Sequence, residues 1–275
     1  MMGYSPELST TDLDVIEFDW EMNSKAKRLY ITISSEPAFG GLILSNGIIG
    51  NRKPVIKFNS KWFYDSTFGN TEFKLTDSGA SLYKLKGNNY FLELVNWRPF
   101  NMHDPANDWL STYPLVSAVC KWAYTNNFTD IISLSSSVLH DFINSPKYKP
   151  FPPEELYVFD VHTSKYVKKP AKPKNKKQEM MLSPPHFLFT RVWSEFMPTG
   201  KALNVIAGSD GVDSIDINAV NTLCAYLKSE GITISQKTID KTYTEIQKAQ
   251  KESDAISESL ITNKANPSNN GVMYG

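Results

Sequence analysis

The sequence predicts an α/β fold: a single domain with a mixed central sheet flanked by helices, a basic insertion and a C-terminal tail. Three observations support this fold class. Two compact apolar segments, residues 129–135 and 202–208, have the character of strands that are buried on both faces. A helical pattern stands next to each of them, and parallel strands are joined by right-handed crossovers. Between residues 54 and 95, short β-rich runs alternate with turn residues, as in a meander.

Composition sets limits on the function. The chain has 275 residues, 41% of them hydrophobic, which is enough for a sizeable core. Lys and Arg together number 29, as do Asp and Glu, so no overall charge attracts the protein to nucleic acid or to an acidic membrane. Cys120 and Cys224 each stand in apolar surroundings and are expected to be buried thiols rather than a disulfide. With no signal peptide and no membrane span in the pattern, we expect a cytoplasmic and nuclear protein.

The pattern in the first half of the chain predicts mainly β-strands. Residues 1–24 are polar and acidic, and we expect weak order there, with residues 15–18 as the part that docks. Residues 27–33 alternate and predict the first strand. Ser35-Glu36-Pro37 then starts a short buried helix over residues 38–44. The β-like runs of the meander are residues 54–59, 73–75, 81–85 and 90–95.

The second half alternates between helices and strands. Apolar residues at helical spacing predict a helix over residues 109–124, before the strand at 129–135. Three serines, Ser135 to Ser137, then suggest the cap of a short helix through His140. A further helix begins at Ser183-Pro184-Pro185 and leads residues 187–196 into the core.

The C-terminal part follows the strand at residues 202–208. A helix opens at Asp213 and runs through Leu227, and Gly231 ends it. Residues 235–260 predict one or two more helices with a sparse apolar stripe, typical of an edge helix or of one that faces a partner.

A segment rich in proline and lysine interrupts this order between residues 144 and 178. We expect one domain over residues 25–262, with a disordered insertion at about 164–180. Two interpretations remain open for the insertion: a solvated surface loop, or a patch that acts as a nuclear-localisation signal or binds an acidic partner. Its clustered lysines are Lys165, Lys168, Lys169, Lys172, Lys174, Lys176 and Lys177.

Motifs for common chemistries are missing. The sequence has no glycine-rich phosphate loop, no Gly-x-Ser-x-Gly, no His-Glu-x-x-His and no Cys-x-x-Cys, so we expect no cofactor and no metal. The four histidines, His103, His140, His162 and His186, are isolated from one another. Asp210 and Asp213 follow a strand, where an α/β enzyme carries its acidic groups. A small-molecule enzyme of phosphorylase-like fold, using these two residues, therefore stays as the alternative hypothesis.

The last residues form a candidate docking motif. Residues 263–275 are polar up to Asn270 and are expected to form a flexible tail. Met273 can fill an apolar slot, Tyr274 adds a ring with a hydroxyl donor, and the carboxylate of Gly275 can accept a charge-assisted bond. A hydrophobic residue followed by Tyr at these two places arises by chance in roughly 1% of chains.

The order of these segments, together with the tail, resembles the eukaryotic proteasome assembly chaperone 1 family. The resemblance is carried by the segments at residues 29–33, 130–134, 183–188, 203–206 and 216–227, and by the hydrophobic-Tyr-X end at Met273, Tyr274 and Gly275. Gly275 departs from the family, which tends to have a side chain there.

The resemblance implies a non-enzymatic chaperone that pairs with a second, related chaperone into a heterodimer. This pair would sit on the outer face of the ring of α subunits of the 20S proteasome. The tail would enter a pocket between neighbouring α subunits, where its carboxylate would meet a lysine.

Overall fold

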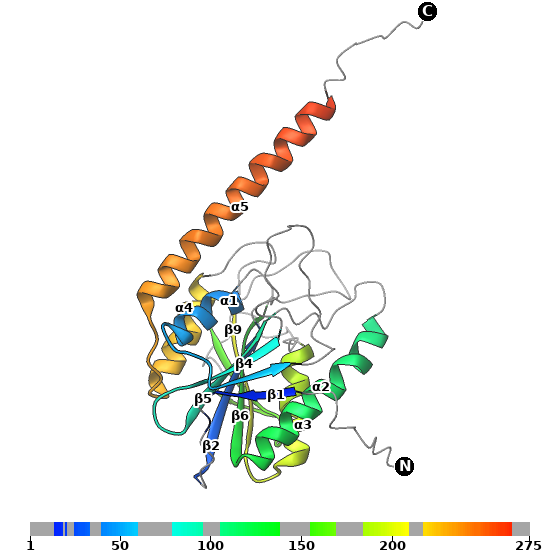
Figure 1. Cartoon of the computed structure of the whole chain (residues 1–275), viewed down its shortest axis with the longest axis vertical. Coiled ribbons are helices and arrows are strands. Elements are labelled where there is room, and N and C mark those ends of the chain that lie inside the picture. Colours follow the sequence, from blue (N-terminus) through cyan, green and yellow to red (C-terminus); the bar gives the residue numbers. More distant parts are fainter. Residues whose placement is uncertain are drawn as a thin grey trace, which may run out of the picture.

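The computed structural model describes residues 14–18, 20, 25–33, 40–59, 79–95, 105–137, 155–168, 184–208 and 217–265. In these residues the chain forms one α/β domain around a nine-stranded mixed sheet, ordered β1-β3-β4-β5-β2-β6-β9-β7-β8 (Figure 1). The predicted fold class is confirmed. No helix in this part of the chain is both long enough and apolar enough to cross a membrane.

The elements have the following bounds. The strands are β1 Asp14–Glu17, β2 Lys27–Ile33, β3 Ile56–Asn59, β4 Gly79–Lys84, β5 Asn89–Val95, β6 Phe128–Ser137, β7 Leu156–Asp160, β8 Lys165–Lys168 and β9 Lys201–Gly208. The helices are α1 Gly40–Ile49, α2 Pro105–Thr125, α3 Pro184–Phe196, α4 Ile217–Ser229 and α5 Gln236–Ala265.

The centre of the sheet is parallel and the flanks are antiparallel. Strands β5, β2, β6 and β9 run parallel to one another, which explains the nearly continuous apolar runs of β2 and β9. Strands β3, β4 and β5 form an antiparallel meander, as predicted, and the predicted run at residues 73–75 lies outside the described residues. On the other flank, β7 pairs with β9 and with β8, also antiparallel.

Alternation along the central strands divides the core into two layers. Leu29 and Ile131 belong to one buried cluster, together with Trp193 of α3 and residues of α2. Tyr30 and Ile132, their neighbours in sequence, belong to the other cluster, with residues of α1, α4 and the first turns of α5. Helices α2 and α3 therefore cover one face of the sheet, and α1 and α4 cover the opposite face.

The predicted disordered insertion at about 164–180 is wrong at its start. Residues 165–168 are strand β8, which forms a hairpin with β7. The side chain of Asp160 closes the turn by accepting bonds from His162 N and Thr163 Oγ1, both at 3.0 Å. Phe159 and Tyr166 then pack edge to face across the two strands at 5.3 Å. Residues 169–180 lie outside the described residues, so the rest of that prediction stays a prediction.

Three boundaries also differ from the expectation. Ser135 to Ser137 extend β6 and pair with β9 instead of capping a helix, because an adjacent parallel strand satisfies their backbone groups. Inside the segment expected to be weakly ordered, β1 pairs with β3. Helix α5 continues to Ala265, past the predicted start of the tail at residue 263.

Candidate functional site

The residues predicted to dock, Met273, Tyr274 and Gly275, lie outside the described residues, as do Asp210 and Asp213 of the alternative hypothesis. The structure does describe the element that leads to the predicted docking motif. This element is α5, a single helix of 30 residues that ends ten positions before Gly275. We call its first part, residues 236–246, the anchored half and the remainder, residues 247–265, the projecting half.

The anchored half packs on α1. Ile239 is fully buried and Thr242 is 7% exposed. Asn46 of α1 donates a hydrogen bond from Nδ2 to Thr242 Oγ1 at 3.2 Å. At the start of α5, Ser235 acts as the N-cap, because its Oγ accepts a bond from Thr238 N at 3.2 Å.

A glycine allows the two helices to come close together. A Cβ atom added to Gly47 of α1 would lie 2.5 Å from Ile239 Cγ1, a distance that real side chains do not tolerate. The carbonyl oxygen of Gly47 also accepts a bond from Ser235 N at 2.9 Å. The missing side chain therefore lets Ile239 reach the backbone of α1, and it fixes where α5 begins.

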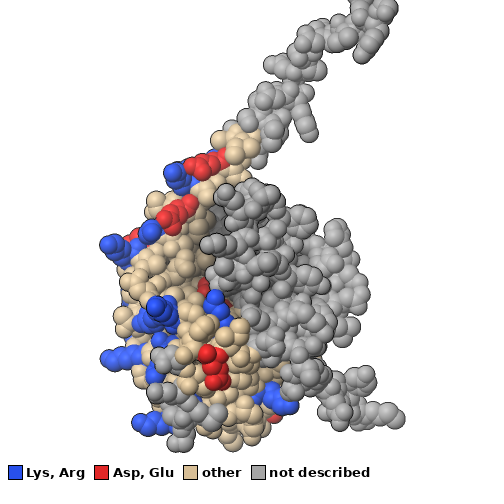
Figure 2. All heavy atoms as spheres, in the orientation of Figure 1, with Lys and Arg blue, Asp and Glu red and all other residues tan. Residues whose placement is uncertain are grey.

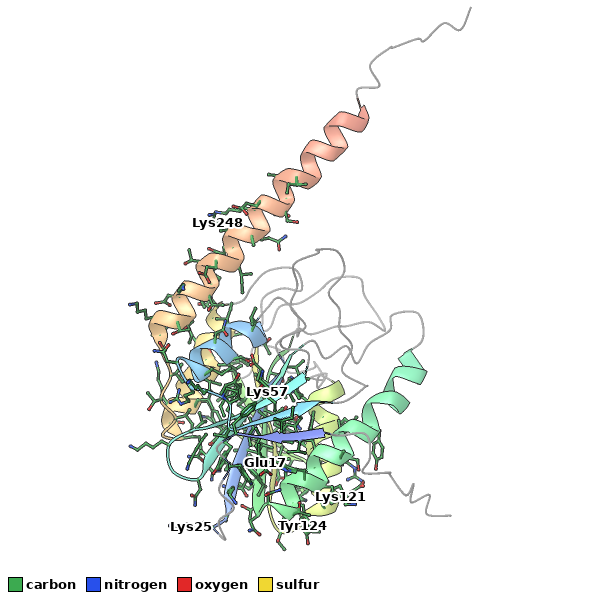
Figure 3. The ribbon with its side chains drawn as sticks, viewed as in Figure 1. Glu17, Lys25, Lys57, Lys121, Tyr124 and Lys248 are labelled. Atoms are coloured by element: carbon green, nitrogen blue, oxygen red, sulfur yellow. The ribbon has the colours of Figure 1, made fainter. Side chains whose placement is uncertain are left out.

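The projecting half leaves the domain (Figure 1). Residues 247–256 are all exposed, and Ile256 is 61% exposed. The helix is supported here by local pairs: Lys248 and Glu252 lie 3.8 Å apart, and Gln250 donates to Asp254 at 3.0 Å. Figure 2 shows opposite charges close together along α5, and Figure 3 places Lys248 on the part that extends beyond the sheet.

The geometry of α5 separates its two ends. Thirty helical residues span about 45 Å, so Ala265 is held far from the sheet. The charges that surround the projecting half belong to ordinary solvated side chains at helical spacing. What the helix provides is a defined position for the chain that follows it.

At the carboxyl ends of the parallel strands, the described residues enclose a small cavity. It lies between the start of α1, the end of β6 and α4, and its lining includes Thr32, Gly40, Ser136 and Val220. Its volume is about 10 Å³, room for one water molecule. The residues that directly follow β2, β6 and β9 lie outside the described residues. In the described chain, no group of three or more His, Cys, Asp or Glu side chains could hold a metal ion.

A buried polar cluster escaped the sequence-based prediction. Ser133 Oγ is hydrogen-bonded to Nδ1 of His186, and Asn204 Nδ2 donates to Thr190 Oγ1 at 2.8 Å. All four residues are at most 1% exposed, so this serine and histidine have no contact with a substrate from solvent. They hold α3 on strands β6 and β9 instead. The only signal in the sequence was a polar residue inside each apolar strand.

The two cysteines are not candidate nucleophiles. Cys120 and Cys224 are buried free thiols, as predicted. Burial raises the pKa of Cys120 far above its ordinary value. Burial also raises the pKa of Cys224 to about 11, although the charge of Lys228 acts in the opposite direction. Both thiols therefore stay protonated at neutral pH and unreactive.

Comparisons with known proteins give a fold and no sequence family. No protein-family profile matches the chain, and no curated protein matches it. Among solved structures, it is similar to PbaB of Pyrococcus furiosus, described as an archaeal proteasome activator, with TM-score 0.56 and 11% identity over 88% of this chain and 99% of that chain.

Two further solved structures have the same fold. PbaA of Pyrococcus furiosus, described as an archaeal homolog of proteasome-assembly chaperone, matches with TM-score 0.52 and 12% identity over 90% of this chain and 99% of that one. A Thermoplasma acidophilum protein of unknown function matches with TM-score 0.54 and 14% identity over 88% and 91%. At these identities the likeness establishes a shared fold along most of the chain.

Proposed function

We propose that the chain is a proteasome assembly chaperone that acts as a heterodimer with a second, related chaperone. In this proposal the pair binds the outer face of the α-subunit ring of the 20S proteasome and promotes its assembly. The observation that carries it is the continuous helix α5, anchored on α1 at one end and exposed at the other. The shared fold with PbaA and PbaB supports the same assignment.

The docking element is the C-terminal motif. Met273 fills an apolar slot between neighbouring α subunits, and Tyr274 packs its ring beside it and donates from its hydroxyl. The carboxylate of Gly275 pairs with a lysine of the same pocket. Because Gly275 has no side chain, only its carboxylate contributes at the last position.

In this proposal, a contact made by the domain and a contact made by the tail together give the affinity for the α-subunit ring. A ten-residue chain without regular structure has a root-mean-square reach of roughly 17 Å, enough to search for a pocket near the end of α5. A contact made by the domain raises the effective concentration of the tail at that pocket. Binding of this kind can be displaced by another tail, as an assembly factor requires. The proposal includes no enzymatic activity, cofactor, nucleic acid or membrane, and places the protein in the cytoplasm and nucleus.

The decisive experiment removes Met273, Tyr274 and Gly275 and measures the α subunits that co-purify in a native pull-down followed by mass spectrometry. We expect recovery to fall at least about tenfold, since the apolar, aromatic and charged contacts are all lost. Tyr274→Ala should lose nearly as much, and amidation of the C-terminus should also weaken binding. Circular dichroism should show unchanged folding.

A matched control lies in the same tail. Asn270→Ala changes a polar side chain upstream of the motif and should leave recovery of α subunits unchanged. If the truncated chain recovers α subunits as well as the intact one does, the proposal is wrong. Loss of the related chaperone instead of the α subunits would also overturn it, because the tail would then serve the heterodimer.

A further inference from the structure

Strand β8 is an edge strand in the described part of the chain. It is the last strand in the order of the sheet and pairs with β7. All four of its residues, Lys165–Lys168, are exposed. The outward N–H and C=O groups of an edge strand can pair with an extended segment of another chain, which then adds a strand to the sheet.

Two consecutive large apolar side chains lie exposed on β8. Tyr166 is 41% exposed and Val167 is 59% exposed. The ring of Tyr166 packs edge to face on Phe159, with 5.3 Å between the ring centroids, and on Tyr157 at 6.0 Å. These contacts hold the ring in place on one face of the hairpin and still leave much of it in water. Exposed apolar groups of this kind are typical of a surface that another chain covers.

A bulge places both lysines of β8 on one face of the sheet. The residues of β7 that lie opposite Lys165 and Lys168 are two positions apart, although the lysines are three positions apart in the sequence. Val167 is therefore the extra residue of the bulge. Because side chains alternate between the faces of a sheet, the two lysines lie on one face and Tyr166 lies on the other.

The surroundings of β8 are basic. Residues 161–178 contain seven lysines and no Asp or Glu, although acidic and basic residues balance over the whole chain. In the described part of the chain, neither Lys165 nor Lys168 forms an ion pair. Asp160 lies opposite Lys165, but its carboxylate accepts bonds from the turn of the hairpin. A strand that carries carboxylates would be complementary to this edge.

We propose that β8 binds an extended acidic segment of another protein chain, which adds a strand to the sheet. The segment has two carboxylates separated by one apolar residue. In an extended strand these carboxylates point to one face, toward Lys165 and Lys168, and the apolar residue between them points to the face of Tyr166. The pattern is the same in both chain directions, so parallel and antiparallel addition both satisfy it.

Lysines and a bulge on an edge strand also prevent unwanted pairing. That role calls for no exposed apolar side chain, whereas two such side chains lie between the lysines of β8. The two roles are compatible, because an edge that repels basic strands still accepts an acidic one. The opposite charges then select the partner, and the apolar contact adds affinity.

Strand β8 takes no part in the proposed docking of the tail. It belongs to the sheet, whereas α5, which leads to the tail, is anchored on α1. The experiments on β8 require neither α subunits nor a second chaperone. Binding at β8 can therefore fail while docking of the tail holds, and docking of the tail can fail while binding at β8 holds.

Two peptides of identical composition test the binding to the full-length chain by fluorescence anisotropy. Both are short, rich in β-branched residues and carry two glutamates. In the first peptide one valine separates the glutamates, and in the second the glutamates are adjacent. We expect the first peptide to bind about threefold more tightly, because adjacent glutamates point to opposite faces and only one of them can meet a lysine. Rising salt should weaken the binding.

Charge reversal on β8 tests the location of the site. Lys165→Glu with Lys168→Glu should weaken binding of the first peptide at least about tenfold, since two attractions become repulsions. Lys248→Glu with Lys251→Glu, on the exposed projecting half, is the matched control. It changes the net charge by the same amount and should leave the affinity unchanged. Circular dichroism should show that both double variants are folded.

Equal affinity for the two peptides would overturn the proposal, as would binding that the reversal on β8 leaves unaltered, or no binding of either peptide at millimolar concentration. A single-stranded oligonucleotide that binds more tightly than the first peptide through the same lysines would also overturn it, because the site would then serve nucleic acid. Self-association of the unmodified chain that the reversal on β8 abolishes would assign the edge to a second copy and overturn the proposal as well.

Discussion

The two halves of α5 share one backbone conformation but have opposite surroundings. In the anchored half, Ile239 is fully buried against α1, whereas Ile256 in the projecting half is 61% exposed. Tertiary packing stabilises the first half, and only local ion pairs and hydrogen bonds support the described side chains of the second. The comparison teaches that one helix can serve as part of the core at one end and as a support for the chain that follows at the other.

The strongest test of this difference between the two halves is the same substitution at Ile239 and at Ile256. Ile239→Ala should lower the free energy of unfolding by about 3 kcal/mol, because it leaves a cavity between α1 and α5. Ile256→Ala should change it by less than about 0.5 kcal/mol, since its side chain is already in water. Urea denaturation followed by circular dichroism measures both. Equal losses would show that the two halves are equally packed.

Thiol labelling resolves the boundary between the halves. Thr242→Cys introduces a thiol at a position that is 7% exposed, and Ser253→Cys introduces one at an exposed position. We expect the second to react with a thiol reagent at least about thirtyfold faster, because the first requires a local opening of the α1–α5 contact. The unmodified chain supplies the background, which should be near zero while Cys120 and Cys224 stay buried. Similar rates at the two positions would contradict the anchoring.

A substitution at Gly47 tests how closely α1 and α5 approach each other. Gly47→Ala gains about 1 kcal/mol in helix propensity but places its Cβ against Ile239, so we expect a net loss of about 1–2 kcal/mol in stability. Gly40→Ala is the matched control in the same helix, because its Cβ would meet Val220 Cγ2 at an ordinary 3.8 Å. Combining Gly47→Ala with Ile239→Ala should cost less than the sum of the two. A strictly additive result would argue against direct contact.

The smallest effect is expected in the projecting half. Lys248→Ala removes the ion pair with Glu252 and should reduce helix stability by about 0.3 kcal/mol, a difference that high salt should abolish. Lys251→Ala is the control on the same exposed stretch, where the described residues give it no ion pair. Helix content from circular dichroism at low and high salt would distinguish the two variants. A larger loss from Lys248→Ala would mean that this lysine has a further contact.

Sequence patterns predicted the fold wherever one periodicity extended over a whole element. The central strands and the helix ended by Gly231 were found in this way, and Gly231 has a positive φ of 79°. The hairpin of β7 and β8 was missed because neighbouring lysines and prolines masked its short alternation of Tyr157, Phe159 and Tyr166. Strand β1 was expected to be weakly ordered because it lies in a polar and acidic segment and its apolar centre is only two residues long.

The candidate site was less predictable than the fold. The motif at Met273, Tyr274 and Gly275 is a sequence property, and the described residues do not extend to it. The contact of Gly47 with Ile239 could not be predicted, because nothing in either local pattern shows that residues so far apart in the chain meet. For the same reason the cluster of Ser133, His186 and Asn204 was not anticipated.

The close contact of Gly47 with Ile239, which we call the pivot of α5, also has a mechanical consequence. From Ile239 to Ala265 the helix axis extends about 39 Å, so a tilt of about 10° at the pivot swings the tip through about 7 Å. Helix α5 thus converts a small rotation at the pivot into a displacement of its end that is comparable to the width of a binding pocket. A small loosening of the contact between α1 and α5 would therefore misplace the C-terminal end of α5, even in a molecule that remains fully folded.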